Sequence, residues 1–435
     1  MKRILLLLAP LALVACQDAT EPVDPVSPML SAGASLQTAE QVVPGRVVVK
    51  LAEGASVIDV TAAYGLSFER RAPRAAFVIL RGPAGTERTL AARLTADPQV
   101  LWAEPDYLRQ PTAIDPRLWA FYNPGGLTIY YTRGRTKGAP VTSYRSLADA
   151  DEDNIEGYAT GGQKVAVGSI DTGVDFGHPE FASGQLVAGW DWYSDDADPS
   201  DEDGHGTHTT GTMVGRTVGV AGVARAGSNV KVYVQRVCGP PGCPSSAIAS
   251  AIIAAADYGV VAMNLSLSGS TESEAEKAAI AYAHVFGSLV VCSAGNGGTA
   301  VVQCPACDPL AISVSATNWR DGLTYYSSWG EGLDLSAPGG EMYSNTTEES
   351  GIYSSYLGGG YRYLQGTSMA APQVTGTAGI VGSVTGLRGD ALRARLEGTV
   401  DDLGTPGYDP IFGWGRLNAY RAVTNATPVE ASVTN

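Results

Sequence analysis

Gly366-Thr367-Ser368-Met369-Ala370-Ala371-Pro372 places a serine directly after a Gly-Thr turn, at the expected start of a helix of small residues. A serine hydroxyl becomes a useful nucleophile only when a base takes its proton and a donor stabilises the oxyanion that forms. Gly366 lets the backbone approach a substrate closely, and a helix N-terminus offers free N–H groups to an anion. An ordinary helix cap would also explain Ser368. A catalytic role therefore requires a base and a donor elsewhere in the chain.

Three segments upstream supply candidates for these tasks. They are Asp171-Thr172-Gly173, His205-Gly206-Thr207-His208 and Ser293-Ala294-Gly295-Asn296. Asp171 follows the apolar run Val165–Ile170, which predicts a buried parallel strand, and open α/β sheets bind ligands at the carboxyl ends of such strands. Each motif alone has a plainer explanation: a turn aspartate, a weak pair of metal-binding histidines, a turn asparagine. Together, an acid, a base, an amide donor and a nucleophile in this order indicate a serine hydrolase.

With these motifs the chain resembles the subtilisin-like serine proteases, or subtilases, whose catalytic residues follow the order Asp, His, Ser. The matching blocks are Ile170–Val174, Asp203–His208, Gly366–Pro372 and Gly413–Ala419. The resemblance covers residues 161–424, which we take as the catalytic domain. It implies an α/β fold with a doubly wound parallel sheet.

The resemblance also implies a role for each motif residue. Asp171 would orient the imidazole of His205, which would take the proton of Ser368 and return it to the leaving amine. Ser368 would attack the scissile carbonyl. The side-chain amide of Asn296 and the backbone N–H of Ser368 would bind the oxyanion.

The segment Ala262–Gly269 is similar to the subtilase strand and loop that pair with the substrate backbone. Ser266, Leu267 and Ser268 would then form one rim of the cleft, and Ser293, Ala294 and Gly295 the wall of the first specificity pocket. A plain core strand is the alternative. Subtilases usually have glycine where Ser268 stands, so a side chain there would narrow the pocket mouth. We expect broad specificity with a preference for apolar or aromatic residues.

An unusual acidic stretch, Trp190–Asp203, precedes His205. Such a run is usually a solvated loop, but clustered carboxylates also gather calcium. The stretch resembles a calcium loop of some thermostable subtilases, with Asp191, Asp196 and Asp198 at matching positions and Ser194 in place of an expected acid. We predict a structural Ca²⁺ ion here and no organic cofactor.

Composition narrows the class of partner. The 435 residues carry a net charge of −15, which argues against nucleic acid or anionic membrane surfaces. Lys2-Arg3 and the apolar run Ile4–Val14, too short to span a membrane, predict a bacterial export signal. Residues 1–16 end in Leu13-Val14-Ala15-Cys16, which resembles a lipobox; an ordinary cleavage site is the alternative. Cys16 would carry a lipid anchor at the cell envelope before processing, and the mature enzyme would be a secreted monomer.

Residues 43–110 predict a separate small domain. Strands are expected at 46–51, 75–80 and 100–105, and helices from Ser56 and over 87–96, an alternation compatible with a ferredoxin-like sandwich. The unit resembles the subtilase propeptide, an intramolecular chaperone and inhibitor, with cleavage expected between Leu108 and Leu118. Residues 17–42 would be a tether, 111–160 a linker with the mature N-terminal region, and 425–435 a tail.

Five cysteines follow Cys16, and an exported protein can keep disulfides. Cys238 and Cys243 are the best candidates for a bridge across a turn. Cys304 and Cys307 are candidates for a second one, although either of them pairing with Cys292 is also compatible with the sequence. The odd count leaves at least one thiol free or intermolecular.

The sequence thus predicts an exported serine endopeptidase made as a zymogen, acting on peptides and proteins. Two other functions use the same residues. One is a catalytically silent surface lipoprotein that only binds peptides, and the other is a peptide ligase that passes the acyl group to an amine. The complete set of Asp171, His205, Ser368 and Asn296 argues against the first.

Overall fold

The computed structural model describes residues 42–71, 77–111, 120, 128–130, 140–143, 162–216, 220, 222–224, 229–342 and 350–426. The predicted signal peptide with Cys16, nearly all of the tether, linker and tail, and most of the expected cleavage window lie outside these residues. Within them no helix is long and apolar enough to cross a membrane.

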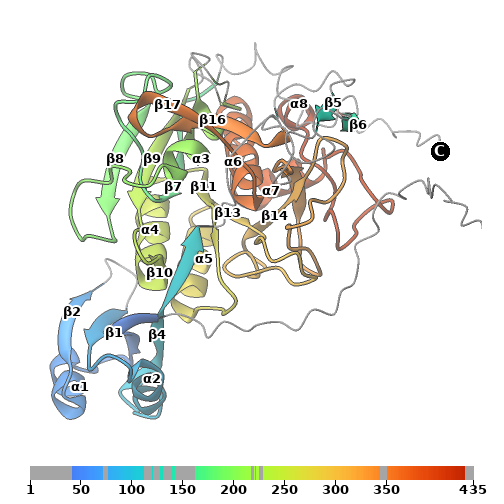
Figure 1. Cartoon of the computed structure of the whole chain (residues 1–435). Helices are drawn as coiled ribbons and strands as arrows, with labels where there is room; N and C mark the ends of the chain where they lie inside the picture. Colours follow the sequence, from blue (N-terminus) through green and yellow to red (C-terminus); the bar gives the residue numbers. More distant parts are fainter. Residues whose placement is uncertain are drawn as a thin grey trace, which may run out of the picture. The chain divides into compact units, whose positions relative to one another are not determined.

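A parallel sheet of seven strands forms the centre of residues 162–426 (Figure 1). Its spatial order is β15-β14-β13-β11-β7-β9-β8, and every neighbouring pair is parallel. The strands are β7 (Val165–Asp171), β8 (Leu186–Asp191), β9 (Val230–Arg236), β11 (Ala262–Leu265), β13 (Leu289–Ser293), β14 (Ile312–Thr317) and β15 (Leu335–Pro338). The central strands β11 and β13 are buried along their whole length and mostly apolar, because both faces of the sheet are covered.

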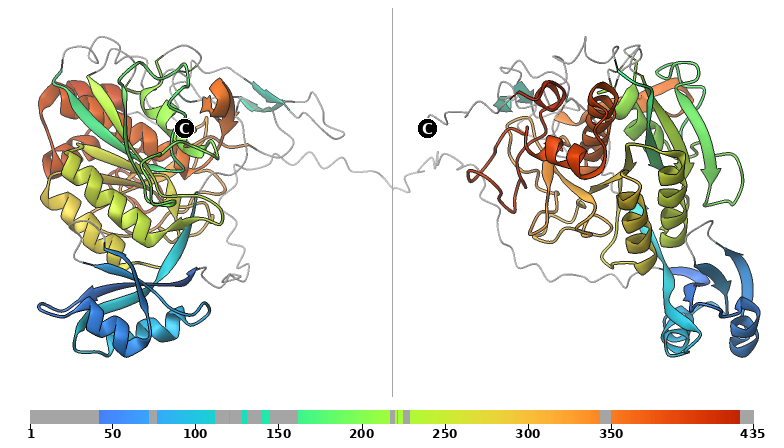
Figure 2. Two further views of the ribbon diagram at one scale, coloured as in Figure 1. Left: turned by 90° about the vertical axis from the view of Figure 1, so that its left-hand side faces the viewer. Right: turned by 180° about the vertical axis from the view of Figure 1, so that it is seen from behind.

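Helices pack on both faces of this sheet. On one face α4 (Ser245–Tyr258) and α5 (Glu274–Val285) lie side by side (Figure 2) and share a core that includes Ile248, Ile280 and Met263. On the other, α3 (His205–Val214) and α6 (Thr367–Thr385) bury Met213 and Val374 against a second core. Helices α7 (Gly389–Glu397) and α8 (Ala419–Thr424) extend that layer. The predicted doubly wound α/β fold is confirmed.

Short elements complete the described residues that follow the N-terminal domain. They are β10 (Cys243–Pro244), β12 (Leu267–Ser268), the hairpin β16 (Ile352–Tyr356) and β17 (Gly360–Leu364) with the 3₁₀ turn η3 (Leu357–Gly359) between, and the pair β5 (Thr128–Tyr130) and β6 (Pro140–Ser143). Disulfides join Cys238 to Cys243 and Cys304 to Cys307, while Cys292 is a buried free thiol. The Cys238–Cys243 bridge is the one that the sequence favoured, and Cys304–Cys307 is one of the pairings that it left open.

The N-terminal domain is an antiparallel sheet with two helices. Its elements are β1 (Val42–Leu51), α1 (Val57–Tyr64), β2 (Ser67–Arg71), β3 (Val78–Arg81), α2 (Glu87–Thr95) and β4 (Val100–Pro111), and the strand order is β4-β1-β3-β2. Ser56 caps α1 by accepting the Asp59 N–H at 3.4 Å. This βαββαβ arrangement confirms the ferredoxin-like prediction. Strand β2 was not predicted, and β4 runs six residues beyond the expected Pro105.

The alternation along β1 explains how this small domain is held. Val47 and Val49 face the domain's own helices, in a core with Leu90 of α2. Val48 points the other way and joins the core of α4 and α5 in the catalytic domain. One sheet face thus closes the small domain and the other packs on the catalytic domain.

Candidate active site

Asp171 is the last residue of β7, and its carboxylate is buried at 2% exposure. Oδ1 accepts the Thr172 backbone N–H at 2.7 Å, and Oδ2 accepts the hydroxyl of Thr209 at 3.3 Å. Its position at the carboxyl end of a central parallel strand is where an α/β sheet places ligand-binding groups.

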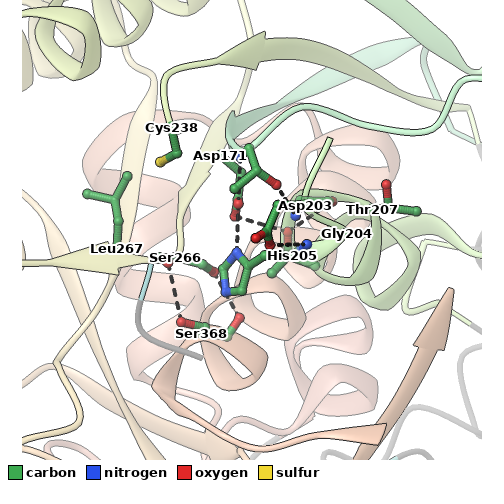
Figure 3. A network of polar contacts seen from close by, with 12 residues as sticks. Asp171, Asp203, Gly204, His205, Thr207, Cys238, Ser266, Leu267 and Ser368 are labelled. Atoms are coloured by element: carbon green, nitrogen blue, oxygen red, sulfur yellow. Dashed lines mark hydrogen bonds and ion pairs between the residues drawn. The ribbon is translucent and has the colours of Figure 1, made fainter. Parts of the chain in front are cut away.

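His205 begins α3, and its Nδ1 lies 2.6 Å from Asp171 Oδ1 (Figure 3). The ring is 3% exposed, and Nε2 has no hydrogen-bond partner among the described residues. Burial by itself would lower the pKa of His205, but the adjacent Asp171 carboxylate outweighs it, so the pKa lies above its usual 6.5. The imidazole is thus oriented through Nδ1, and Nε2 is the nitrogen left to exchange a proton.

The close approach of α3 to β7 depends on glycine. A side chain at Gly206 would overlap the carbonyl oxygen of Gly173 and press on the Asp171 side chain. The Gly206 N–H instead donates to Thr172 Oγ1 at 2.8 Å. The motif with the acid and the motif with the base can therefore pack closely, because Gly206 lies directly against Gly173 and Thr172.

Asp201 holds the start of α3, and the sequence interpretation missed it. Its Oδ1 accepts N–H groups of Asp203 and Gly204 at 3.0 and 2.9 Å, and its Oδ2 accepts the Thr207 N–H at 2.9 Å. Burial raises the pKa of Asp201, although these donors oppose the shift. An acid shortly before a helix that begins at His205 is a capping pattern, and it was hidden inside the acidic run.

His208 is a neutral structural group. Burial is the main cause that lowers its pKa to about 3. Its Nε2 lies 3.0 Å from the carbonyl oxygen of Ile352 and 3.2 Å from that of Arg362. The ring therefore donates to the β16–β17 hairpin, and the metal alternative considered for the histidine pair has no support.

Ser368 is the second residue of α6 and is completely buried. Its Oγ donates to the carbonyl oxygen of Ser266 at 3.3 Å, and Ser266 Oγ donates back to the Ser368 carbonyl at 2.8 Å. Figure 3 shows the His205 ring between Asp171 and Ser368. The three motif residues, distant in sequence, come together at one edge of the sheet.

Asn296 lies beside the start of α6. Its Oδ1 accepts both the backbone N–H and the hydroxyl of Thr367, each at 3.0 Å. With the oxygen held this way, Nδ2 is the end of the amide that can donate to an anion. This orientation is the one that an oxyanion donor needs.

The predicted cleft residues form two connected segments. Ser266 to Ser268 lead into and form β12, and Ser293 to Gly295 follow on from β13, with Ser293 Oγ donating to the Leu267 carbonyl at 3.3 Å. Ser268 Oγ donates to Gln303 Oε1 at 2.7 Å, a residue that the sequence interpretation did not select.

Strand β4 of the N-terminal domain pairs with one of these two segments. It runs antiparallel to β12, with Gln110 opposite Ser268 and Pro111 opposite Leu267, and antiparallel to β10 on its other side. An extended segment held between two strands is how proteases and other receptors bind peptides by strand addition.

Two carboxylates of β4 cap the helices on which the small domain rests. Glu104 accepts N–H groups of Glu274 and Ala275 at the start of α5, at 2.9 and 3.1 Å. Asp106 accepts the Ser246 N–H at 3.0 Å and its hydroxyl at 2.6 Å at the start of α4. Helix N-termini favour negative charge, so these contacts orient β4 toward the cleft.

The acidic loop is internally bonded. Asp191 forms a buried ion pair with Arg236 at 2.9 Å, Asp196 accepts the Asp198 N–H at 2.8 Å, and Asp198 accepts the Ser200 hydroxyl at 2.6 Å. In the part of the chain that the structure describes, no three acidic, histidine or cysteine side chains are grouped so that they could hold a metal ion. Asp191, Asp196 and Asp198 as calcium ligands stay a prediction from the sequence.

Comparisons with known proteins cover both domains. A family model described as the subtilase family matches residues 162–415, and one described as the fervidolysin N-terminal prodomain matches residues 31–106. Thermitase of Thermoactinomyces vulgaris is 37% identical over 264 residues, covering 60% of this chain and 88% of that protein. A thermophilic serine proteinase of Bacillus sp. strain AK1 is 34% identical, covering 78% of this chain and 77% of that protein.

A solved structure is similar to both domains together. Fervidolysin from Fervidobacterium pennivorans, a keratinolytic enzyme related to subtilisin, matches with a TM-score of 0.70 at 25% identity. The match covers 91% of this chain and 63% of that one.

Proposed function

The chain belongs to the subtilase family of serine endopeptidases, and from that premise we propose that Asp171, His205 and Ser368 hydrolyse peptide bonds as a catalytic triad. The observation that carries the proposal is the buried 2.6 Å contact between Asp171 and His205, next to a serine at the start of α6. Neither alternative function, a silent peptide-binding lipoprotein or a peptide ligase, has support in the comparisons.

In this proposal each step of the reaction is carried out by an identified atom of the triad. His205 Nε2 takes the proton from Ser368 Oγ as the oxygen attacks the scissile carbonyl, and the Asp171 carboxylate stabilises the imidazolium that forms. His205 next gives the proton to the leaving amine, and an acyl group remains on Ser368 until water removes it. For the first step the hydroxyl turns from the Ser266 carbonyl, its partner at 3.3 Å, to Nε2.

Asn296 supplies an oxyanion donor in this proposal, and its removal is a direct test. We expect Asn296→Leu to lower kcat by about 10²- to 10³-fold with little change in KM, because the amide meets negative charge only in the transition state. Steady-state kinetics on a peptide amide measure both constants. Asn296→Asp keeps the size but replaces the donor with an acceptor, so it should lose at least as much. An unchanged kcat in both variants would contradict the assignment.

The N-terminal domain is a propeptide, and we propose that the chain removes it by its own activity. Strand β4 ends at Pro111, which is opposite Leu267, the residue directly after Ser266. The Ser266 carbonyl lies next to the nucleophile. The bond that follows Thr112 is therefore our candidate for the cut, inside the window that the sequence predicts. Before release, β4 would inhibit the enzyme by filling the cleft.

We also propose that the chain is exported and anchored to the membrane by a lipid on Cys16 before processing. Cys16 lies on the propeptide side of the proposed cut, so processing would separate the mature enzyme from its lipid. In a bacterial host, we expect fractionation to find the propeptide with membranes and the mature fragment in the medium. A mature fragment that itself carries the lipid would contradict this order of events.

Calcium stays a prediction from the sequence. Subtilases commonly bind structural calcium. In this chain the carboxylates of Asp191, Asp196 and Asp198 pair with Arg236 or accept hydrogen bonds from within the loop. No step of the proposed reaction uses a metal.

A further inference from the structure

The Gln303 side chain lies between the two segments of the substrate cleft. Its Oε1 accepts the Ser268 hydroxyl at 2.7 Å, and its backbone N–H donates to the Ala294 carbonyl at 2.9 Å. Gln303 therefore connects the rim formed by β12 to the wall formed by residues 293–295.

The carboxamide oxygen fills space directly beside Gly295. A side chain at position 295 would overlap Gln303 Oε1, and Gly295 itself has a φ of +105°. Ser268, the other partner, is only 5% exposed. The gap between rim and wall is thus closed by a hydrogen-bonded polar group.

The backbone behind Gln303 is fixed as well. Cys304 exchanges two hydrogen bonds with Gly269, at 2.8 and 2.9 Å, directly after β12. The Cys304–Cys307 disulfide closes the same turn. Because the chain is anchored on both sides, the carboxamide cannot leave the gap by a simple shift of the loop.

This closed gap lies in the part of the cleft nearest to Ser368. Gly295 precedes Asn296, and Ser268 is two residues from Ser266, whose carbonyl contacts Ser368. A side chain that enters between rim and wall therefore belongs to the residue just before the cut bond.

We propose that Gln303 determines specificity and restricts that substrate residue to small side chains such as Ala, Ser and Thr. The proposal rests on the proteolytic function proposed above. An aromatic side chain would have to displace the carboxamide and break its bond to Ser268, leaving a buried hydroxyl without its acceptor. The cut proposed above is consistent with this restriction, because the residue before it is a threonine, Thr112. The restriction differs from the apolar or aromatic preference that the sequence predicts.

The test compares peptides that differ only in the residue before the cut: Ala, Ser, Thr, Leu and Phe. For the processed enzyme we expect kcat/KM for Thr to exceed that for Phe by about 10-fold or more. Gln303→Gly should raise kcat/KM for Phe by about 10-fold and so reverse the order, and Ser268→Gly should move it in the same direction. Val301→Ala, on the same loop and 65% exposed, is the control that keeps the original order.

Each ratio is measured within one variant, so a partial loss of folded enzyme does not affect it. Gln303→Ala is measured beside Gln303→Gly as a second variant that lacks the carboxamide. An unchanged Thr-to-Phe ratio in both Gln303 variants, or a processed enzyme that prefers Phe, overturns the proposal for Gln303. A chain that hydrolyses none of the five peptides, nor a denatured protein, contradicts the proteolytic function instead.

Discussion

Replacing Ser368 with alanine should leave a chain that folds but neither cleaves peptides nor removes its own propeptide. The substitution deletes one buried oxygen that donates to a carbonyl at 3.3 Å, so the packing of α6 changes little. Without Oγ no acyl-enzyme forms, and kcat should fall by about 10⁶-fold. The remaining groups, the oxyanion donor and the cleft, cannot replace the nucleophile.

The measurement is intact mass over time, on chains that begin at Gln17 and are refolded from denaturant so that host proteases are absent. The parent chain should lose residues 17–112, and Ser368→Ala should keep its full mass. Ser383→Ala is the matched control: it is the same substitution in the same helix, at a buried serine that donates to the Gln163 carbonyl. Equal shortening of the Ser368→Ala and Ser383→Ala chains would contradict self-processing by Ser368.

The motif residues could be selected from the sequence because each stands at the end of a strand or the start of a helix that its neighbouring residues predict. Asp171 ends an apolar run that predicts a buried strand, and Ser368 lies at the start of a helix of small residues. The order of strands and helices in the N-terminal domain could also be predicted, because apolar residues recur with a different spacing in a strand than in a helix, and this spacing is visible within each segment.

What the sequence left out depends on contacts between distant segments. Gln303 sits in a loop without any pattern, and its partner Ser268 is 35 residues away. The extension of β4 to Pro111 is stabilised by β10 and β12, which belong to the other domain. The contacts of the acidic loop were not predictable either: Asp201 caps α3 and Asp191 pairs with Arg236, and neither contact follows from a count of charges.

Asparagine at position 171 should lower kcat by about 10⁴-fold and move the acid limb of the pH profile. In the parent enzyme His205 must be neutral to act as a base, and the Asp171 carboxylate holds its pKa above 6.5. Activity should therefore fall as the pH drops through that raised value. Asparagine removes the charge and turns an N–H toward Nδ1, which favours the tautomer that cannot accept a proton at Nε2. With the carboxylate gone, the burial of the ring dominates and the pKa of His205 falls.

The profile of kcat/KM against pH in both enzymes separates this positioning role from a loss of folding. A destabilised site would lower the amplitude and leave the midpoint of the acid limb in place, whereas loss of the carboxylate must shift the midpoint to lower pH. Asp390→Asn is the control, because this carboxylate is 81% exposed and lies far along the chain, on α7. If the Asp171→Asn enzyme keeps the acid limb of the parent, His205 is not the group that titrates, and the pairing at 2.6 Å has another purpose.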